Sequence, residues 1–301
     1  MAMYLGNKKV AVTNTVEKQV PSMKAFFEAG GKCQGSTATS FEGCWQFDDT
    51  ANMTSMDNMF VSCGSIITVP LFNTIKVTSM RSMFSDCRQI KTVPLFDTSN
   101  VKNMSNMFNT CLNLNSIPLF NTSNVTNMSY MFQSCSKLKD VPLLDTSNVT
   151  NMSGMFSSSN IITVPLFNTS NVTNMSYMFQ SCSNITYVPQ FNTSKVTNMN
   201  SMFYYCYSMT TVPLLDTSKV TNMSSMFYYC YSLESIHMIN INANLDISAS
   251  TKFTREALLE IIGNLKAQTS GTKTLTMGST NLAKLTDEDK AIATSKGWTL
   301  A

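Results

Sequence analysis

The sequence predicts a repeat solenoid, in which parallel β coils of about 24 residues with short helical turns are stacked between α/β terminal caps. The segment VTNMSYMFQSC occurs twice without a change, at residues 125–135 and 172–182. The phenylalanine of a Met-Phe pair also recurs every 24 residues, with a single step of 23. A unit this short cannot bury a core alone, so its neighbours must supply the apolar contact. The recurring phenylalanines are Phe60, Phe84, Phe108, Phe132, Phe156, Phe179, Phe203 and Phe227.

Every coil has the same order of residue types, as residues 125–148 illustrate. A valine precedes two methionine columns, the phenylalanine, a cysteine column, an aliphatic residue, a Val/Ile-Pro pair and an Asx-Thr pair. The stretches VTNM and LKDVPLL alternate in polarity, which predicts short strands, and SYMFQSC predicts a helical or tight turn. Phe132 and Cys135 are then expected to face the same way. Strands at a constant spacing would form parallel ladders, with coils about 4.8 Å apart.

Two features are expected to bend or disturb the ladders. A proline column recurs from Pro70 to Pro213, and it is expected at a strand margin or bend because proline has no N–H to donate. The Asx-Thr-Ser stretch that follows is typical of turns whose side chains bond to nearby backbone and along the stack. The coil with the sequence MFSSSNIITVP lacks one residue and the cysteine, which predicts a local irregularity at residues 157–160.

The two ends of the chain differ in kind from the solenoid, which is expected over residues 45–237. Residues 1–44 are predicted to be an N-terminal cap or attachment segment. They contain a strand or hairpin at MYLGNKKVAV and a short helix at SMKAFFEAGGKC. Residues 238–301 are predicted to form a C-terminal α/β cap.

The C-terminal segment carries clear helix signals. The helix TREALLEIIGNLKA is expected to have Thr254 as its N-cap, and the strand-like KTLTMG follows it. Thr286 and Asp289 form a capping-box-like start for a second helix, which is expected to stop at Gly297. A terminal strand, WTLA, completes the predicted cap.

Sulfur-containing side chains fill three columns that are predicted to lie inside the coils. Seven of the nine cysteines share one column beside the phenylalanine, where free thiols are favoured because neighbouring coils project them side by side. A zinc site is disfavoured, since the chain has no C-x-x-C motif and a single histidine. Sixteen of the 23 methionines fill the two methionine columns, as core and not as a Met-rich binding groove. The seven cysteines are Cys63, Cys87, Cys111, Cys135, Cys182, Cys206 and Cys230.

Composition argues against several classes of partner. Hydrophobic residues make up 43% of the chain, enough for a large core, whereas charged residues make up 13% and the net charge is +3. No basic stripe is present, so we expect no nucleic-acid partner. No n-region with an apolar h-region and no long apolar run occur, so we expect neither a signal peptide nor a membrane span. The protein would then reach a cell exterior within a particle or after lysis.

The sequence has no constellation that is typical of catalysis. His237 stands where other coils have proline, without an aspartate or nucleophile in register, which favours a structural role. Asp97, Asp145 and Asp216 share a column with asparagines, which indicates turn residues and not the carboxylate pair of a glycosidase. No glycine-rich phosphate loop is present. We therefore expect a protein that is not an enzyme, with no cofactor and no metal site.

The repeat has a recognisable family pattern. The pattern V-x-x-M-x-x-M-F-x-x-C-x-x-L-x-x-V-P with DTSNVTNMSGMF resembles the BspA-like leucine-rich repeats over residues 45–237, and is most similar to the variant in mycoplasmal and other bacterial surface proteins. This resemblance implies leucine-rich-repeat-like coils and a role in surface adhesion or protein binding. The ends MYLGNKKV and TNLAKLTDEDKAIATSKGWTL resemble modules at the ends of bacteriophage tail and fibre proteins.

The repeats differ from one another chiefly in their tyrosines. The segment MFYYCYS occurs twice, which places three tyrosines of one coil beside three of the next, where other coils have small polar residues. With Phe203 and Cys206 facing inward, these tyrosines must largely face outward and form an aromatic patch. Such a patch could bind a ligand or pack against the cap or another subunit. The predicted binding residues are Tyr204, Tyr205, Tyr207, Tyr228, Tyr229 and Tyr231, with Tyr177 and Tyr187 at the edge.

Two functions are consistent with these features. The first is a recognition protein of a bacteriophage virion, in the tail or an appendage, which binds a host-surface protein or glycan and contacts other virion proteins through its terminal segments. The second is a bacterial BspA-like interaction protein or surface adhesin with no virion role. A homo-oligomer is possible in either case, although no coiled-coil heptad supports a trimer.

Overall fold

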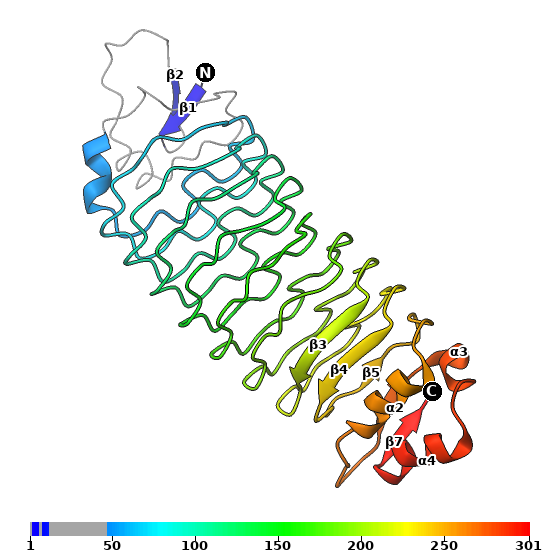
Figure 1. Ribbon diagram of the computed structural model, residues 1–301. Helices are drawn as coiled ribbons and strands as arrows, with labels where there is room; N and C mark the ends of the chain where they lie inside the picture. The colour runs from blue at the N-terminus through cyan, green and yellow to red at the C-terminus, as the bar shows by residue number, and fades with distance from the viewer. Residues whose placement is uncertain (1, 6–7, 12–46) are drawn as a thin grey trace.

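The computed structural model describes residues 2–5, 8–11 and 47–301, and it shows a rod of stacked coils that ends in a small α/β unit (Figure 1). Parallel bridges between the Asn columns join each coil to the next, for example Asn103 to Asn127 and Asn127 to Asn151. The same column is bridged from Ser55 to Asn222. The predicted repeat solenoid is therefore the fold of the chain.

The segment around each Met-Phe pair forms tight turns, and no helix occurs in the coils between residues 53 and 254. Of the two predicted alternatives, the tight turn is confirmed and the short helical turn is not formed in these coils, for a reason visible in the backbone. The N–H groups of Tyr130 and Phe132 donate to carbonyls of the next coil at 2.8 and 2.9 Å. The intervening N–H of Met131 closes a turn on Met128 at 3.3 Å. The ladder thus takes the donors that a helix would need for its own i to i−4 bonds.

Left-handed residues produce the sharp reversals in these turns. Tyr130 and Ser134 have φ angles of 55° and 58°, and the equivalent positions of the other coils are also positive. Most of these positions hold Asn, Ser, Asp or Thr, and one holds Gly154. Two columns of left-handed backbone therefore recur through the rod, at positions where a bulky residue is an uncommon occupant.

The predicted VPLL-type strands exist only near the C-terminal end of the rod. There β3 (Thr211–Asp216) and β4 (Ser235–Ile239) pair in parallel. In several preceding coils the residue after proline sits at the centre of a γ-turn, as shown by the bonds from Phe96 N–H to Pro94 O at 3.0 Å and from Phe120 N–H to Pro118 O at 2.9 Å. The expected bend at the proline column is confirmed, and it replaces the extended strand that we predicted there.

The core is made of continuous columns of side chains. The Met-Phe phenylalanines are buried and stack along the rod, with ring centroids 5.4 Å apart for Phe60 and Phe84 and 5.8 Å apart for Phe203 and Phe227. The sixteen methionines of the two repeat columns are buried as predicted, and so are the seven cysteines, which are free thiols. Each thiol from Cys87 onward also donates to the Phe carbonyl of the preceding coil, for example from Cys135 to Phe108 O at 3.1 Å. Phe108 O also accepts the N–H of Cys111 at 3.1 Å, so the thiol gives this buried carbonyl a second hydrogen bond, a role beyond that of a small hydrophobe.

The Asx-Thr turns act as predicted. The hydroxyl of Thr98 donates to Asn121 O in the next coil at 2.8 Å, and Asp97 Oδ1 accepts the N–H and hydroxyl of Ser99 at 3.0 and 2.6 Å. These two bonds lower the pKa of Asp97, which keeps it ionised. The aspartates of this column are therefore turn residues.

The N-terminal segment is described in part. The strands β1 (Ala2–Leu5) and β2 (Lys8–Ala11) form an antiparallel pair, as the predicted hairpin requires. A short 3-10 helix, η1 (Phe47–Asn52), precedes the first regular coil. The helix predicted at SMKAFFEAGGKC lies outside the described residues, as do Cys33 and Cys44.

The C-terminal unit continues the apolar core and covers the end of the rod (Figure 1). Thr254 accepts from Ala257 N–H at the start of α2, and a capping box of Thr286 and Asp289 begins α4, as predicted. Arg255 binds the largely buried carboxylate of Asp289 with two hydrogen bonds of 2.7 and 2.8 Å, which joins α2 to α4. The elements are α2 (Arg255–Gly263), α3 (Gly278–Leu282), α4 (Asp287–Ser295) and a parallel sheet in the order β5 (Leu245–Asp246), β6 (Lys273–Thr276) and β7 (Trp298–Leu300).

Candidate binding surfaces

The six tyrosines of the two MFYYCYS segments form one contiguous group, called the tyrosine cluster below. Rings of one coil stack on those of the next, with centroid distances of 5.4 Å for Tyr204 and Tyr228 and 4.7 Å for Tyr205 and Tyr229. Tyr207 and Tyr231 make the third stacked pair at 6.0 Å. The identical positions of the two segments, one coil apart, thus produce the predicted aromatic patch.

Contacts within each coil join the three stacks into a single surface. Tyr204 meets Tyr205 edge-on at 4.3 Å, and Tyr228 meets Tyr229 in the same way at 4.2 Å. Tyr207, Tyr228 and Tyr231 are 42%, 38% and 48% exposed, while the other three are half-buried. The C-terminal unit therefore does not cover the cluster, so the alternative in which it packs against the cap is wrong.

Four of the six clustered tyrosines have raised pKa values. A hydrogen bond with Tyr204 raises the pKa of Tyr205, and one with Tyr229 raises that of Tyr228. Burial of the ring and the neighbouring phenols raise the pKa of Tyr207 and of Tyr231. The surface consequently offers apolar ring faces and neutral hydroxyl groups, and ion pairing cannot contribute to its binding near pH 7.

Two of the clustered tyrosines occupy left-handed backbone. Tyr205 and Tyr229 both have a φ angle of 60°, in the column where other coils place Ser, Asp or Thr. A bulky residue in this region is an outlier that costs on the order of 1 kcal/mol or more. Aromatic rings are thus held at positions that local backbone energetics disfavours.

The remaining two predicted residues lie outside the cluster. Tyr177 accepts a hydrogen bond from Asn200 Nδ2 at 2.6 Å. Burial and, to a smaller extent, the neighbouring Tyr177 raise the pKa of Tyr130. Between these two tyrosines is Gly154, where an added Cβ would lie 2.2 Å from the Tyr130 ring. Tyr187 is 59% exposed, and among the described residues no ring contact joins it or Tyr177 to the six. That both border the cluster without a ring contact to it stays a prediction.

A second surface was missed by the sequence reasoning. The residue after each proline is leucine in six coils, and five consecutive members, the leucine stripe, are 60 to 63% exposed. The γ-turn at this position projects the side chain away from the core. The sequence signal that could have revealed this surface is an apolar column between two buried columns, as Leu95 lies between Val93 and Phe96. The stripe consists of Leu71, Leu95, Leu119, Leu143 and Leu166, and Leu214 continues it at 42% exposure.

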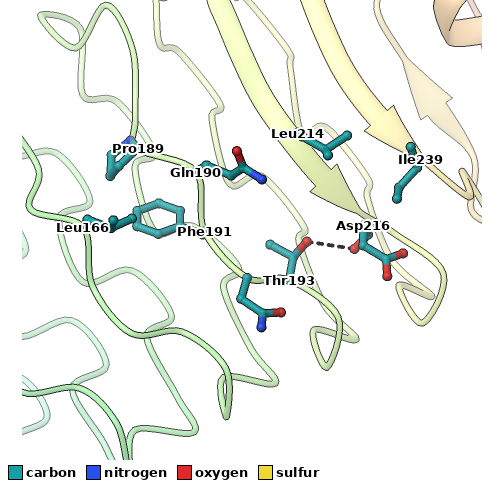
Figure 2. A pocket seen from close by; sticks show the side chains of 9 residues that line it. Leu166, Pro189, Gln190, Phe191, Thr193, Leu214, Asp216 and Ile239 are labelled. Atoms are coloured by element: carbon teal, nitrogen blue, oxygen red, sulfur yellow. Dashed lines mark hydrogen bonds between the residues drawn. The ribbon is translucent and has the colours of Figure 1, made fainter.

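The stripe is interrupted by an open pocket of about 610 Å³ (Figure 2). Gln190 takes the place of leucine there, between Leu166 and Leu214 of the neighbouring coils. Pro189 and Asp216 are also in its wall, and the Asp216 carbonyl accepts from the hydroxyl of Thr193 at 2.9 Å. The pocket is thus a notch in an otherwise apolar row.

The other residues that were weighed for chemistry make the following contacts in the described part of the chain. His237 Nδ1 lies 2.7 Å from Glu260 Oε1, which ties β4 to α2. Over the described residues, no three His, Cys, Asp or Glu side chains are grouped so that they could hold a metal ion. The same residues include no helix that is both long and apolar enough to span a bilayer.

Comparison with known families identifies the repeats. The family described as "Mycoplasma protein of unknown function, DUF285" matches residues 6–92, 54–166 and 160–257. The chain therefore belongs to this family, in agreement with the resemblance to mycoplasmal repeats. A search of curated proteins gives no match.

Solved structures with a related architecture include bacterial surface proteins. A leucine-rich cell surface protein from Faecalibacterium prausnitzii is 17% identical, with a TM-score of 0.39, over 62% of this chain and 57% of that protein. A T. pallidum leucine-rich repeat protein is 15% identical, with a TM-score of 0.36, over 64% and 80% of the two chains. An internalin from Listeria monocytogenes is 12% identical, with a TM-score of 0.33, over 75% and 67%. The phage-like resemblance of the chain ends stays a prediction.

Proposed function

We propose that this protein is a non-enzymatic recognition protein, in which the solenoid is a scaffold and the tyrosine cluster binds a protein or glycan on a cell surface. The observation that carries the proposal is the exposed, uncharged cluster of six stacked tyrosines on an otherwise repetitive rod. Tyrosine offers rigid contact area with a polar tip, which suits both protein anchors and sugar rings. The left-handed backbone of Tyr205 and Tyr229 supports a functional reason for these residues.

Membership of a family named for mycoplasma proteins favours a bacterial interaction protein or adhesin over a virion component. The place in a bacteriophage tail that the chain ends suggested, with cytoplasmic synthesis and no signal peptide, stays a prediction. Co-purification of the protein with phage particles would support that setting, and its detection on intact bacterial cells would support the cellular one. The tyrosine cluster is the proposed binding surface in both cases.

The test replaces Tyr204, Tyr207, Tyr228 and Tyr231 by serine and measures binding of the labelled protein to bacterial cells and to arrayed envelope glycans. We expect the variant to lose at least about tenfold in affinity, because stacked aromatic anchors commonly dominate an interface. Circular dichroism and melting temperature should change little, since these rings lie outside the core columns.

The matched control replaces Ile292, an exposed apolar residue of α4 outside the cluster, by serine. It should bind like the natural protein. Equal binding by the tyrosine variant and this control would refute the proposal, and so would a loss of fold in the tyrosine variant.

A further inference from the structure

The leucine stripe is a large apolar surface on the described rod. The seven coils from Leu71 to Leu214, at about 4.8 Å each, give the stripe a length of about 34 Å. The seven residues from Lys91 to Asp97 cross it in six steps and span at most about 20 Å. The resulting area is at most about 680 Å², at the upper end of the patches that monomers expose, and such patches often bind a partner. The C-terminal unit leaves this surface uncovered, because the leucines stay about 60% exposed.

Charges flank the stripe in a matched way. Lys91 and Asp97 lie on opposite sides of Leu95, and Lys139 and Asp145 lie on opposite sides of Leu143; all four are exposed. The flanks of Leu119, the coil between them, are the neutral Asn115 and Asn121. Each of the two lysines has an aspartate on the other side of the same coil, and Asp140, next to Lys139 on the lysine side, is exposed as well. Over these coils the lysine side thus carries two positive charges and one negative charge, whereas the other side carries the two aspartates.

We infer that the leucine stripe binds a second copy of this chain, with the two rods parallel and related by a two-fold axis that runs along the stripe. Such an axis brings each leucine opposite its own equivalent in the partner. It also turns the lysine side of one copy toward the aspartate side of the other, so that Lys91 faces the partner's Asp97. An antiparallel two-fold pair would instead bring lysine toward lysine. Charge complementarity thus selects the parallel arrangement.

Gln190 supplies a reason for a single register. In the parallel pair, the Gln190 notch of one copy faces the same notch of the other, where two carboxamides can bond to each other. A shift by one coil would place each carboxamide against a leucine and leave it without a partner. One polar residue in an apolar seam has the same effect in coiled coils, where it specifies register at some expense of stability.

The available area fits a modest dimer. At most about 680 Å² per copy lies below the roughly 800 Å² per partner of a stable interface, so we expect a dissociation constant of micromolar order. The tyrosine cluster is formed by residues 204–207 and 228–231, which occupy a different part of the coil from the leucine stripe. The inference therefore does not depend on the proposed recognition function.

Sedimentation velocity of the full chain, from about 1 to 100 µM, tests the inference first. We expect a concentration-dependent dimer, which Leu119→Lys with Leu143→Lys converts to a monomer because like charges would then meet in the seam. Ile292→Lys, on α4, is the matched control and should dimerise normally. A natural protein that stays monomeric throughout, or a lysine variant that still dimerises, would overturn the proposal.

Orientation is tested by cysteine cross-linking and charge exchange. Leu95→Cys should form an intermolecular disulfide with itself under mild oxidation, whereas in an antiparallel pair centred on Leu143 it would face Gln190 of the partner subunit. The unsubstituted chain and Ile292→Cys measure the background. Lys91→Asp alone should weaken dimerisation, and adding Asp97→Lys should restore it. The parallel arrangement would be rejected if Leu95→Cys cross-linked no more than the background controls. It would also be rejected if the double charge exchange failed to restore dimerisation.

Discussion

The coils at residues 77–166 and those at residues 196–231 have the same interior and different exteriors. Phe108 in the first region and Phe203 in the second are both buried in the same stack. Outside, the first region presents a regular row of leucines, while the second carries the six clustered tyrosines. The comparison shows that the repeated residues maintain the scaffold and that the differences between these two groups of coils lie on the surface.

The largest expected effect comes from substitutions in the core, which test whether the two regions have equivalent interiors. Phe108→Ala and Phe203→Ala should each lower the free energy of unfolding by about 3 to 5 kcal/mol, because each leaves a ring-sized cavity in a filled column. The two values should agree within about 1 kcal/mol, since each ring stacks between the phenylalanines of the coils above and below. Phe108 should cost slightly more, because it also contacts the ring of Phe120 at 6.5 Å, where the coil of Phe203 has Leu215. Urea unfolding followed by circular dichroism measures them.

The exterior control for this pair is Leu119→Ala, which removes an exposed side chain of the first region. It should change the stability of the monomer by less than about 0.5 kcal/mol. Clearly unequal costs for the two phenylalanines would mean that the interiors differ, and the comparison would fail.

The thiol column gives the second prediction. Burial raises the pKa of Cys135 from 9.0 to about 12, and it raises that of Cys182 to the same level. A raised pKa in the folded state stabilises the protein below the unfolded pKa, near 9, and this contribution disappears as the pH rises toward 12. We therefore expect a steep loss of melting temperature between about pH 9 and 12.

Thiol labelling separates this cause from general alkaline unfolding. In the native state near pH 8, Ellman's reagent should react with two cysteines or fewer, and after denaturation with about nine, because buried thiols are inert. A Cys135→Ala and Cys182→Ala variant should lose less stability between pH 9 and 12 than the natural chain. Native labelling of five or more would contradict the buried column.

Much of this interior could be predicted from the sequence because a period is a strong constraint. Phe132, Met128 and Cys135 recur at fixed spacing, so the whole column shares one environment. The γ-turn at Leu119 and the left-handed backbone of Tyr205 could not be predicted, because both depend on which N–H groups the adjacent coil occupies. The leucine stripe was missed for the same reason. An apolar column in a solenoid is normally expected to be buried, and only the local turn shows that this column faces outward.

The smallest expected effect concerns the shortened coil, where the repeated interior itself departs from the pattern. In a regular coil, Leu138 N–H closes a turn on Cys135 O at 3.2 Å. Ile161 follows Ser159, the residue in the cysteine column, by only two positions, so this three-residue turn cannot form. Ile161 is still buried, but Val164 is half-buried where Val188 is fully buried.

We therefore expect the amide of Ile162 to exchange about tenfold faster than that of Thr210, which corresponds to about 1.4 kcal/mol of local stability. The two amides are matched, because each donates to the preceding coil, Ile162 to Lys139 O at 2.8 Å and Thr210 to Thr186 O at 3.1 Å. Inserting one lysine after Asn160, together with Ser159→Cys, restores the regular spacing and should bring the two rates together. Equal rates in the natural chain, measured by hydrogen exchange with mass spectrometry or NMR, would show that the neighbouring coils compensate fully for the missing residue.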